Sequence, residues 1–227
     1  MWYPLGMALA LAAAMVAYNT AVSLSRVGSW ALVPLNVGAT VGVVAAASAS
    51  GLSPGEMGLG ADALGRGLLW GLALAPVAPL ALGLALLVPA GVRSLRDVRL
   101  ARLSTGELWF WVLVRIPLAT ALFEEVAFRG VLLGMLGESP GGVALSSVVF
   151  GLWHVGPAWV RSAANRPDAN WTSRFPEIAG TIAATTAGGV LLALLRVHTG
   201  SVVAPVLVHL SVNVAATLAG RRASRPS

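Results

Sequence analysis

The sequence predicts an all-α protein, a polytopic bundle of transmembrane helices. Of its 227 residues, 57% are hydrophobic and only 11% are charged, and the mean hydropathy is +0.81. A soluble domain has about 25% charged residues. The apolar residues also gather in long runs, and about 20 mostly apolar residues suffice to cross a bilayer as a helix. Both observations indicate an integral membrane protein.

Seven apolar runs are long enough to span a membrane. The first has no basic start and exceeds the roughly 7–15 apolar residues of a signal peptide, so we expect a retained span. The fourth exceeds a hydrocarbon core of about 30 Å at about 1.5 Å per residue, so we expect it to tilt, protrude or break. An eighth short element, within that run or near residues 52–54, is the alternative. The runs are 4–24, 29–49, 67–90, 108–136, 142–160, 177–196 and 201–219.

The loop charges predict an orientation. The net charge is +6, and the sequence contains arginine but no lysine. If the spans alternate in direction, one side of the membrane receives Arg66 and Arg196, and the other receives most of the remaining arginines. Because basic loops stay in the cytoplasm, we expect the N-terminus outside and the C-terminus inside, in the cytoplasmic membrane. The basic excess fits anionic lipid better than nucleic acid. The arginines of the basic side are Arg26, Arg93, Arg96, Arg99, Arg102, Arg161, Arg166, Arg174, Arg221, Arg222 and Arg225.

Three charged residues interrupt the fourth run in the stretch FEEVAFRG, residues 123–130. Each charge at mid-membrane costs about 2.5–3.5 kcal/mol on insertion scales, so Glu124, Glu125 and Arg129 must face protein or water. Glu125 and Arg129 are four residues apart with the acid first, which favours an ion pair along the helix. Glu124 lies about 100° around the helix from Glu125 and has no such partner at that spacing. An isolated carboxylate suits a general base or acid; a structural ion pair is the alternative.

Two later runs carry polar residues at a similar depth. His154 lies near the middle of the fifth run, with Phe150 one turn earlier on the same face. In the seventh run, His209 and Asn213 share a face. Either group alone could be a packing residue or an interhelical hydrogen bond worth about 0.6 kcal/mol. Three helices that bring a Glu, a His and a His/Asn pair to one depth instead predict a shared site.

These motifs resemble those of a known family. Glu124-Glu125-x-x-x-Arg129, Phe150-x-x-x-His154 and His209-x-x-x-Asn213 are similar to the successive motifs of the CAAX protease and bacteriocin-processing (CPBP) family, also called Abi or type II CAAX prenyl endopeptidase-like proteins. The resemblance covers about residues 108–217. It implies an intramembrane endopeptidase whose helices enclose a polar cavity. Within a single membrane domain, 1–227, we expect variable N-terminal spans at 1–107, a catalytic core at 108–219 and a basic tail at 220–227.

The resemblance also implies roles for the polar residues. Glu124 and His154 would activate a water molecule, and His209 and Asn213 would stabilise the oxyanion. Such groups are what peptide hydrolysis requires. The residues expected to support them are Glu125, Arg129 and Phe150.

Zinc is the open alternative for this site. One Glu with two His is a ligand set of catalytic zinc, and the ligands would be Glu124, His154 and His209. No His-Glu-x-x-His element is present, and Asn213 beside His209 suits an oxyanion role better than a ligand role. We therefore expect no obligatory cofactor.

Other functions fit less well. Cysteine is absent, which excludes a thiol nucleophile, and no histidine–acid pattern singles out Ser146, Ser147 or Ser211 as a nucleophile. The rival interpretations are a non-catalytic membrane binding or immunity protein with the same fold, and a proton-coupled transporter. The expected partners are the lipid bilayer and a membrane-associated protein or peptide substrate. Arginine without lysine and abundant alanine are typical of a GC-rich bacterial genome, in which prenylated substrates are not expected.

Overall fold

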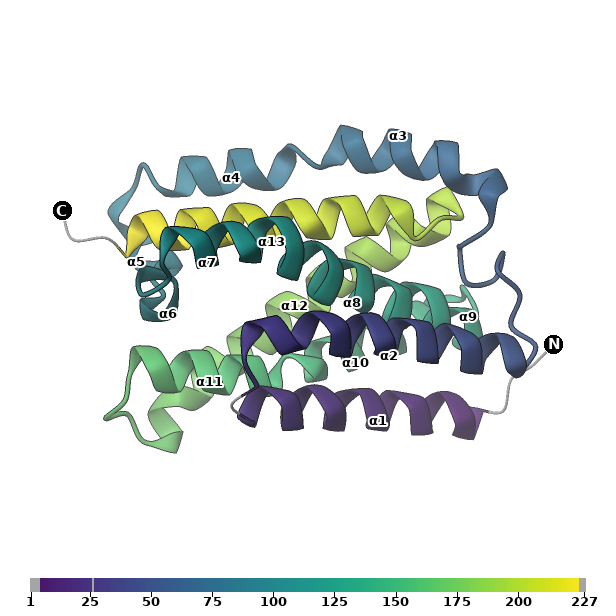
Figure 1. Cartoon of the computed structure of the whole chain (residues 1–227), viewed down its shortest axis with the longest axis horizontal. Coiled ribbons are helices and arrows are strands. Elements are labelled where there is room, and N and C mark those ends of the chain that lie inside the picture. The colour runs from purple at the N-terminus through teal and green to yellow at the C-terminus, as the bar shows by residue number, and fades with distance from the viewer. Residues whose placement is uncertain (1–4, 26, 225–227) are drawn as a thin grey trace.

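The computed structural model describes residues 5–25 and 27–224. Within them the chain is a bundle of helices without any strand, which confirms the all-α prediction (Figure 1). The elements are, in chain order, α1 (Leu5–Leu24), α2 (Ser29–Ala49), the 3₁₀ turn η1 (Ala61–Ala63), α3 (Leu64–Leu74), α4 (Val77–Ala85), α5 (Pro89–Leu95), α6 (Val98–Ala101), α7 (Thr105–Phe110), the π-helical η2 (Trp111–Leu122), α8 (Phe123–Glu125), the π-helical η3 (Val126–Leu132), α9 (Leu133–Leu136), α10 (Pro140–Trp153), α11 (Val155–Asn165), α12 (Trp171–Thr199) and α13 (Val203–Ala223).

The bundle is polytopic. In the described part of the chain, six helical stretches are long and apolar enough to cross a membrane: Leu5–Leu24, Ser29–Ala49, Ala61–Ala85, Pro140–Asn165, Trp171–Thr199 and Val203–Ala223. The helical run from α7 to α9 extends between the same two ends of the bundle, and the start of α1 and the end of α13 lie at opposite ends (Figure 1).

Three predicted runs differ from the helical stretches of the structure by five residues or more at one end or both; one of them, expected at 177–196, is Trp171–Thr199. The run expected at 67–90 is a helical stretch at Ala61–Ala85, because Pro89 begins the separate short helix α5. The run expected at 142–160 extends from Pro140 to Asn165, since apolar composition alone does not mark where a helix ends. Residues 50–60, where an eighth element was the alternative, form turns.

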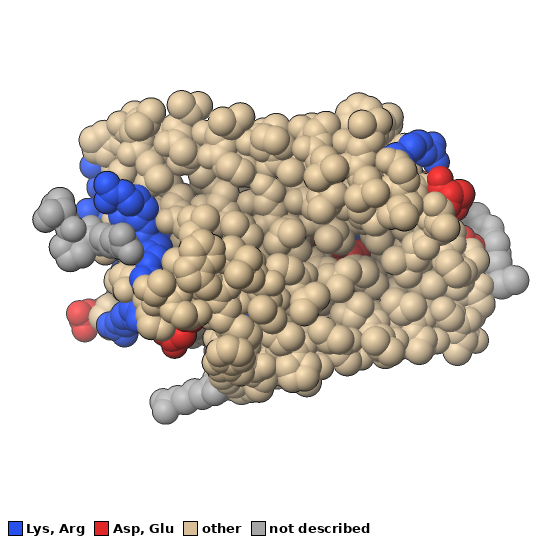
Figure 2. Space-filling model, turned by 45° about the horizontal axis from the view of Figure 1, so that its top comes forward, with Lys and Arg blue, Asp and Glu red and all other residues tan. Residues whose placement is uncertain are grey.

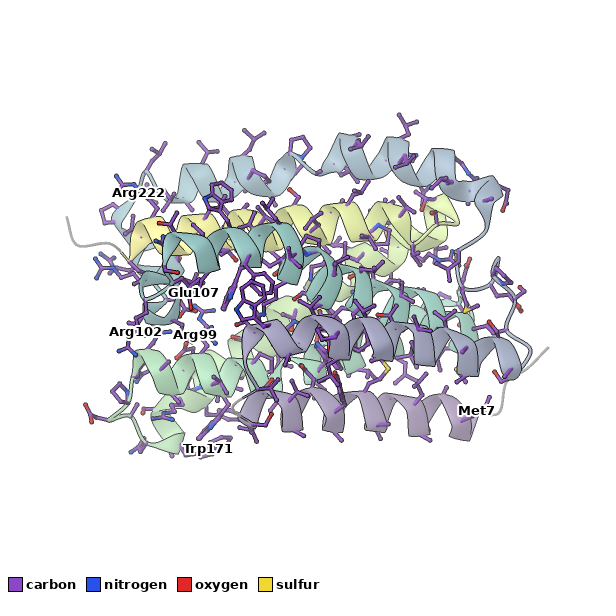
Figure 3. The ribbon with its side chains drawn as sticks, in the orientation of Figure 1. Met7, Arg99, Arg102, Glu107, Trp171 and Arg222 are labelled. Atoms are coloured by element: carbon purple, nitrogen blue, oxygen red, sulfur yellow. The ribbon has the colours of Figure 1, made fainter. Side chains whose placement is uncertain are left out.

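The charged side chains lie mainly at the ends of the bundle. On the face in Figure 2, a broad band between the two ends is almost free of charged residues. Arg99, Arg102 and Arg222 lie at one end together with Glu107, while Met7 lies at the other (Figure 3). The uncharged band matches what the hydrocarbon core of a bilayer requires. Arg26 and Arg225 lie outside the described residues.

Proline breaks one spanning helix, and a neighbouring helix completes its hydrogen bonding. In a continuous helix the Ala75 carbonyl would accept from the N–H of residue 79, but Pro79 has none. The helix is interrupted there between α3 and α4. Ser211 of α13 donates its hydroxyl to the Ala75 carbonyl. Neighbouring helices satisfy freed carbonyls in this way inside membranes, where no water replaces the lost donor.

A compact core surrounds the charged stretch. Phe123 and Phe128 pack with Trp153 in a buried cluster that includes small side chains of α1. Ala8 and Ala12 of α1 are almost fully buried in this cluster, and small residues let transmembrane helices approach closely. The N-terminal helix therefore packs directly against the elements that carry the predicted site.

Candidate active site

The two glutamates lie where the winding of the helix changes. Glu124 and Glu125 belong to α8, a single turn between the π-helical segments η2 and η3. Glu125 and Arg129 are only 0% and 1% exposed, and Glu124 is 7% exposed. π-helical turns in α-helices frequently occur at functional sites. The fourth run, expected to tilt, protrude or break, thus stays helical but changes its winding around the charged residues.

The predicted ion pair is confirmed. Arg129 donates to Glu125 Oε1 at 2.8 Å, and both side chains are buried. The guanidinium also donates to the Gly189 carbonyl at 3.2 Å and lies 4.0 Å from the centre of the Phe150 ring. These contacts compensate the charge of Arg129 inside the bundle.

Glu125 has a second partner that the sequence did not reveal. Nδ1 of His209, on α13, lies 2.6 Å from Glu125 Oε1. An ionised carboxylate only accepts hydrogen bonds, so Nδ1 carries the hydrogen. The other ring nitrogen, Nε2, then faces Glu124. Since 84 residues separate the two partners, no local spacing could have predicted the contact.

His154 lies near the middle of the spanning stretch Pro140–Asn165, as predicted, at the break between α10 and α11. Its N–H bonds to the Gly151 carbonyl three residues back, and α10 ends at Trp153. Pro157 causes the break because it offers no N–H to the Trp153 carbonyl four residues earlier. Asn19 of α1 supplies the missing donor, with Nδ2 2.7 Å from that carbonyl oxygen.

The same break fixes the His154 ring. Nδ1 lies 2.7 Å from the Phe150 carbonyl oxygen. A carbonyl only accepts, so Nδ1 donates and Nε2 keeps its lone pair. The Phe150 ring contacts both imidazoles edge to face, with centroids 4.7 Å from His154 and 5.9 Å from His209.

The three polar side chains meet at one oxygen atom. Glu124 Oε2 lies 4.0 Å from His154 Nε2 and 3.9 Å from His209 Nε2. Both separations exceed a direct hydrogen bond. Among the described residues, this buried oxygen has no hydrogen-bond partner. The arrangement leaves room for a small hydrogen-bonding molecule such as water between the three groups.

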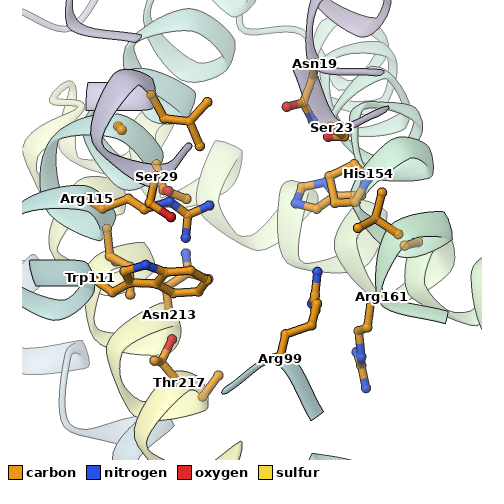
Figure 4. Close-up of a pocket in the computed structure, with 18 of the residues that line it drawn as sticks. Asn19, Ser23, Ser29, Arg99, Trp111, Arg115, His154, Arg161, Asn213 and Thr217 are labelled. Atoms are coloured by element: carbon orange, nitrogen blue, oxygen red, sulfur yellow. The ribbon is translucent and has the colours of Figure 1, made fainter. Parts of the chain in front are cut away.

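A cavity of about 580 Å³ opens beside this centre. Glu124, His154 and Asn213 line it, and Asn213 and His154 lie on opposite sides of the opening (Figure 4). Nδ2 of Asn213 is buried without a partner in the part of the chain that the structure describes. The predicted residues are therefore brought together: three line the cavity, and His209 adjoins it through Glu124.

The cavity also contains a charged residue that the sequence analysis overlooked. Arg115 of η2 lines it, with its guanidinium 4.0 Å from the centre of the Trp111 ring. An arginine inside the predicted run 108–136 was a visible signal, because charges within spans usually mark functional sites. Asn19, which also lines the cavity, had no comparable signal.

The serines weighed as nucleophiles have other hydrogen-bond partners. Ser146 and Ser147 both donate to the Val143 carbonyl, and Ser211 donates to that of Ala75. The hydrogen bonds of these hydroxyls give no support to a serine nucleophile.

The fold and the site together define a polytopic membrane protein with a buried Glu–His–His centre beside a polar cavity. Residues 106–215, close to half of the chain, match the family described as Type II CAAX prenyl endopeptidase Rce1-like. The chain therefore carries an Rce1-like domain, of a protease family, and the resemblance drawn from the motifs is confirmed. Neither the curated proteins nor the solved structures gave a match.

Proposed function

We propose that this protein is an intramembrane endopeptidase that hydrolyses a peptide bond of a membrane-associated protein or peptide, with residues 108–219 as its catalytic core. The observation that supports this most directly is the position of Glu124 Oε2, 4.0 Å and 3.9 Å from the two Nε2 atoms. A base without a partner, facing two imidazoles beside a cavity, suits activation of water.

In the proposed reaction, water bridges Glu124 and His154. Glu124 takes one proton from the water molecule, and His154 Nε2 accepts a hydrogen bond from the second hydrogen of that water. The resulting hydroxide oxygen bonds to the substrate carbonyl carbon. Glu124 then returns the proton to the amide nitrogen as the carbon–nitrogen bond breaks. This sequence conserves protons and needs no co-reactant besides water.

The oxyanion of the tetrahedral intermediate needs donors. Asn213 Nδ2, which is buried without a partner in the described residues, is one candidate. His209 is the other, and it donates through Nε2 when its ring is protonated. Glu125, which accepts from His209 Nδ1 and from Arg129, stabilises that protonated ring. Each lost oxyanion donor costs about 10²–10³ in kcat in a well-studied protease.

The donor types also suit zinc, which would be held by Glu124, His154 and His209. Both Nδ1 atoms bind acceptors and leave Nε2 free, as in many zinc sites. Zinc would lower the pKa of a bound water molecule. The described residues contain no group of three or more His, Cys, Asp or Glu side chains at metal-binding separations. We propose direct activation by Glu124 without an obligatory metal; loss of activity on chelation, restored by zinc alone, would contradict this.

We further propose that the cavity opens on the cytoplasmic side of the cell membrane. Asp97, Arg99 and Arg161 line it, and Arg99 lies at the same end of the bundle as Arg102 and Arg222 (Figure 3). Loops rich in arginine stay in the cytoplasm, so this orientation places the C-terminus inside and the N-terminus outside.

A cleavage assay tests the proposed function. Reconstituted protein is incubated with a library of tagged membrane proteins and apolar peptides, and new termini are identified by mass spectrometry. We expect Glu124→Gln and His154→Ala to lower the rate by at least about 10², whereas exposed His198→Ala keeps it. Equal product formation by all four proteins would show that the hydrolysis does not come from this site.

A further inference from the structure

Arg115 has no ion-pair partner among the described residues. It lies in η2, within the membrane-spanning run, and lines the same cavity as Glu124. No hydrogen bond or ion pair joins its guanidinium to another described residue, and its Nε is buried without a partner. Its contact is the Trp111 ring, which holds the guanidinium plane in place. Because a guanidinium that lines a cavity without an ion-pair partner can bind a planar anion, the position indicates a ligand that supplies the anion.

Two carboxylates line the cavity, and neither forms an ion pair with Arg115; Glu124 faces the two histidines. Asp97 is bound by Arg99 through two hydrogen bonds of 3.0 Å and 2.7 Å. Arg161 donates weakly to the Ser94 carbonyl at 3.4 Å, and its Nε is also buried without a partner. Arg99, Arg115 and Arg161 all border the opening (Figure 4). The cavity therefore carries excess positive charge on the approach to Glu124.

We propose that Arg115 binds a carboxylate of the peptide substrate. The planar guanidinium forms two parallel hydrogen bonds with a carboxylate, and Trp111 fixes its plane. A ligand that fills this cavity also reaches Glu124 and His154, which is why the bound anion belongs to the substrate. This inference rests on the proposed function and extends it: Arg115 selects acidic substrates and orients them, with the carboxylate held away from the negative charge of Glu124.

Selective retention tests this without turnover. Purified Glu124→Gln protein is immobilised in detergent and offered a mixed-sequence library of apolar octapeptides, each present as a free acid and as an isotope-labelled C-terminal amide. A third set has an amidated terminus and one internal Glu or Gln. We expect acids to be retained over their neutral twins by about tenfold or more. Preferential retention of the free acid over its C-terminal amide shows that a terminal carboxylate is bound. Preferential retention of the Glu peptide over the Gln peptide, both with amidated termini, shows that a side-chain carboxylate is bound.

Matched variants assign the preference to one arginine. In the Glu124→Gln background, Arg115→Gln should lower the ratio of acid to neutral peptide to about one, and Arg115→Lys should give an intermediate ratio because lysine lacks the planar fork. Arg102→Gln removes the same charge from an exposed position outside the cavity and should keep the ratio. Size-exclusion chromatography confirms that each variant is folded.

Three results would overturn the inference: a ratio near one in Glu124→Gln protein, a ratio that survives Arg115→Gln, or an equal loss with Arg102→Gln. Adding anionic phospholipid to the micelles tests a lipid occupant; if the lipid displaces acid and amide peptides equally, Arg115 does not read the substrate carboxylate. Retention does not depend on cleavage. Wild-type protein that retains acids but cleaves nothing would count against the proposed function, while carboxylate binding by Arg115 would still be supported.

Discussion

The buried pair of Glu125 and Arg129 leads to a quantitative prediction about stability. Glu125→Gln removes the negative charge at almost constant shape. It leaves the guanidinium of Arg129 without an anion, where the side chain is 2% exposed. Breaking a buried ion pair from one side costs about 3–5 kcal/mol. We expect a loss of about 3 kcal/mol, at the lower end because glutamine keeps an acceptor oxygen for His209.

The ion pair of Glu138 and Arg196 provides a control with an exposed carboxylate. Glu138 pairs with Arg196 at 3.0 Å; the Glu138 side chain is 45% exposed, whereas that of Arg196 is 2% exposed and also donates to the Gly55 and Glu56 carbonyls. Solvent screens the charge of Glu138, and the two carbonyls still accept hydrogen bonds from Arg196 when Glu138 loses that charge. Glu138→Gln should therefore cost much less than Glu125→Gln. Stability is measured by titrating the purified protein in detergent micelles with SDS and following tryptophan fluorescence.

A double variant separates the pair from its two members. Glu125→Gln with Arg129→Gln removes both charges, and loss of a whole buried pair is often nearly neutral. We expect the double variant to be more stable than Glu125→Gln alone. Two results would show that burial does not set the energy of this pair. In one, the stability losses of Glu125→Gln alone and Arg129→Gln alone add up to the loss of the double variant. In the other, Glu125→Gln costs no more stability than Glu138→Gln.

Two further predictions concern the edges of the site. Asn19→Leu should lower the free energy of unfolding by about 1–3 kcal/mol, because the buried carbonyl of Trp153 loses its donor. Adding Pro157→Ala restores a backbone N–H and should recover stability but not cleavage. Recovery of both would contradict a role for the break at His154 in cleavage. Burial raises the pKa of Asp97, but the hydrogen bonds and charge of Arg99 outweigh it and lower that pKa. The stability that Asp97 contributes is therefore complete above the unfolded pKa of about 3.9 and is lost as the pH falls through the folded pKa. Asp97→Asn keeps the helix cap and should remove this pH dependence in urea titrations between pH 7 and 3.

Local patterns predicted the helices and the ion pair. Apolar composition identified the spans, because a bilayer imposes both length and polarity on a helix. The four-residue spacing of Glu125 and Arg129 predicted a contact along one helix, and the structure has it at 2.8 Å. The common depth of Glu124, His154 and His209 predicted their meeting, because spans of similar length align across a bilayer.

The individual hydrogen bonds between distant helices could not be predicted. Asn19 and the Trp153 carbonyl are separated by 134 residues, and their meeting depends on how the helices pack. The break at His154 could have been predicted, since Pro157 removes one helical hydrogen bond wherever it occurs inside a helix. A hydropathy window averages over such a residue and merges two helices into one run.

The N-terminal helices have a consequence for any attempt to isolate the Rce1-like stretch, residues 106–215. Asn36 of α2 donates to the Ala119 carbonyl at 2.6 Å, and its Oδ1 accepts the Tyr18 hydroxyl of α1. Asn19 of α1 likewise donates a hydrogen bond to the Trp153 carbonyl. A fragment that begins at residue 106 would keep Glu124, His154 and His209 but would leave these two carbonyls without their side-chain donors. A stable fragment of this protein therefore has to begin before the matched stretch 106–215, so that α1 and α2 are included.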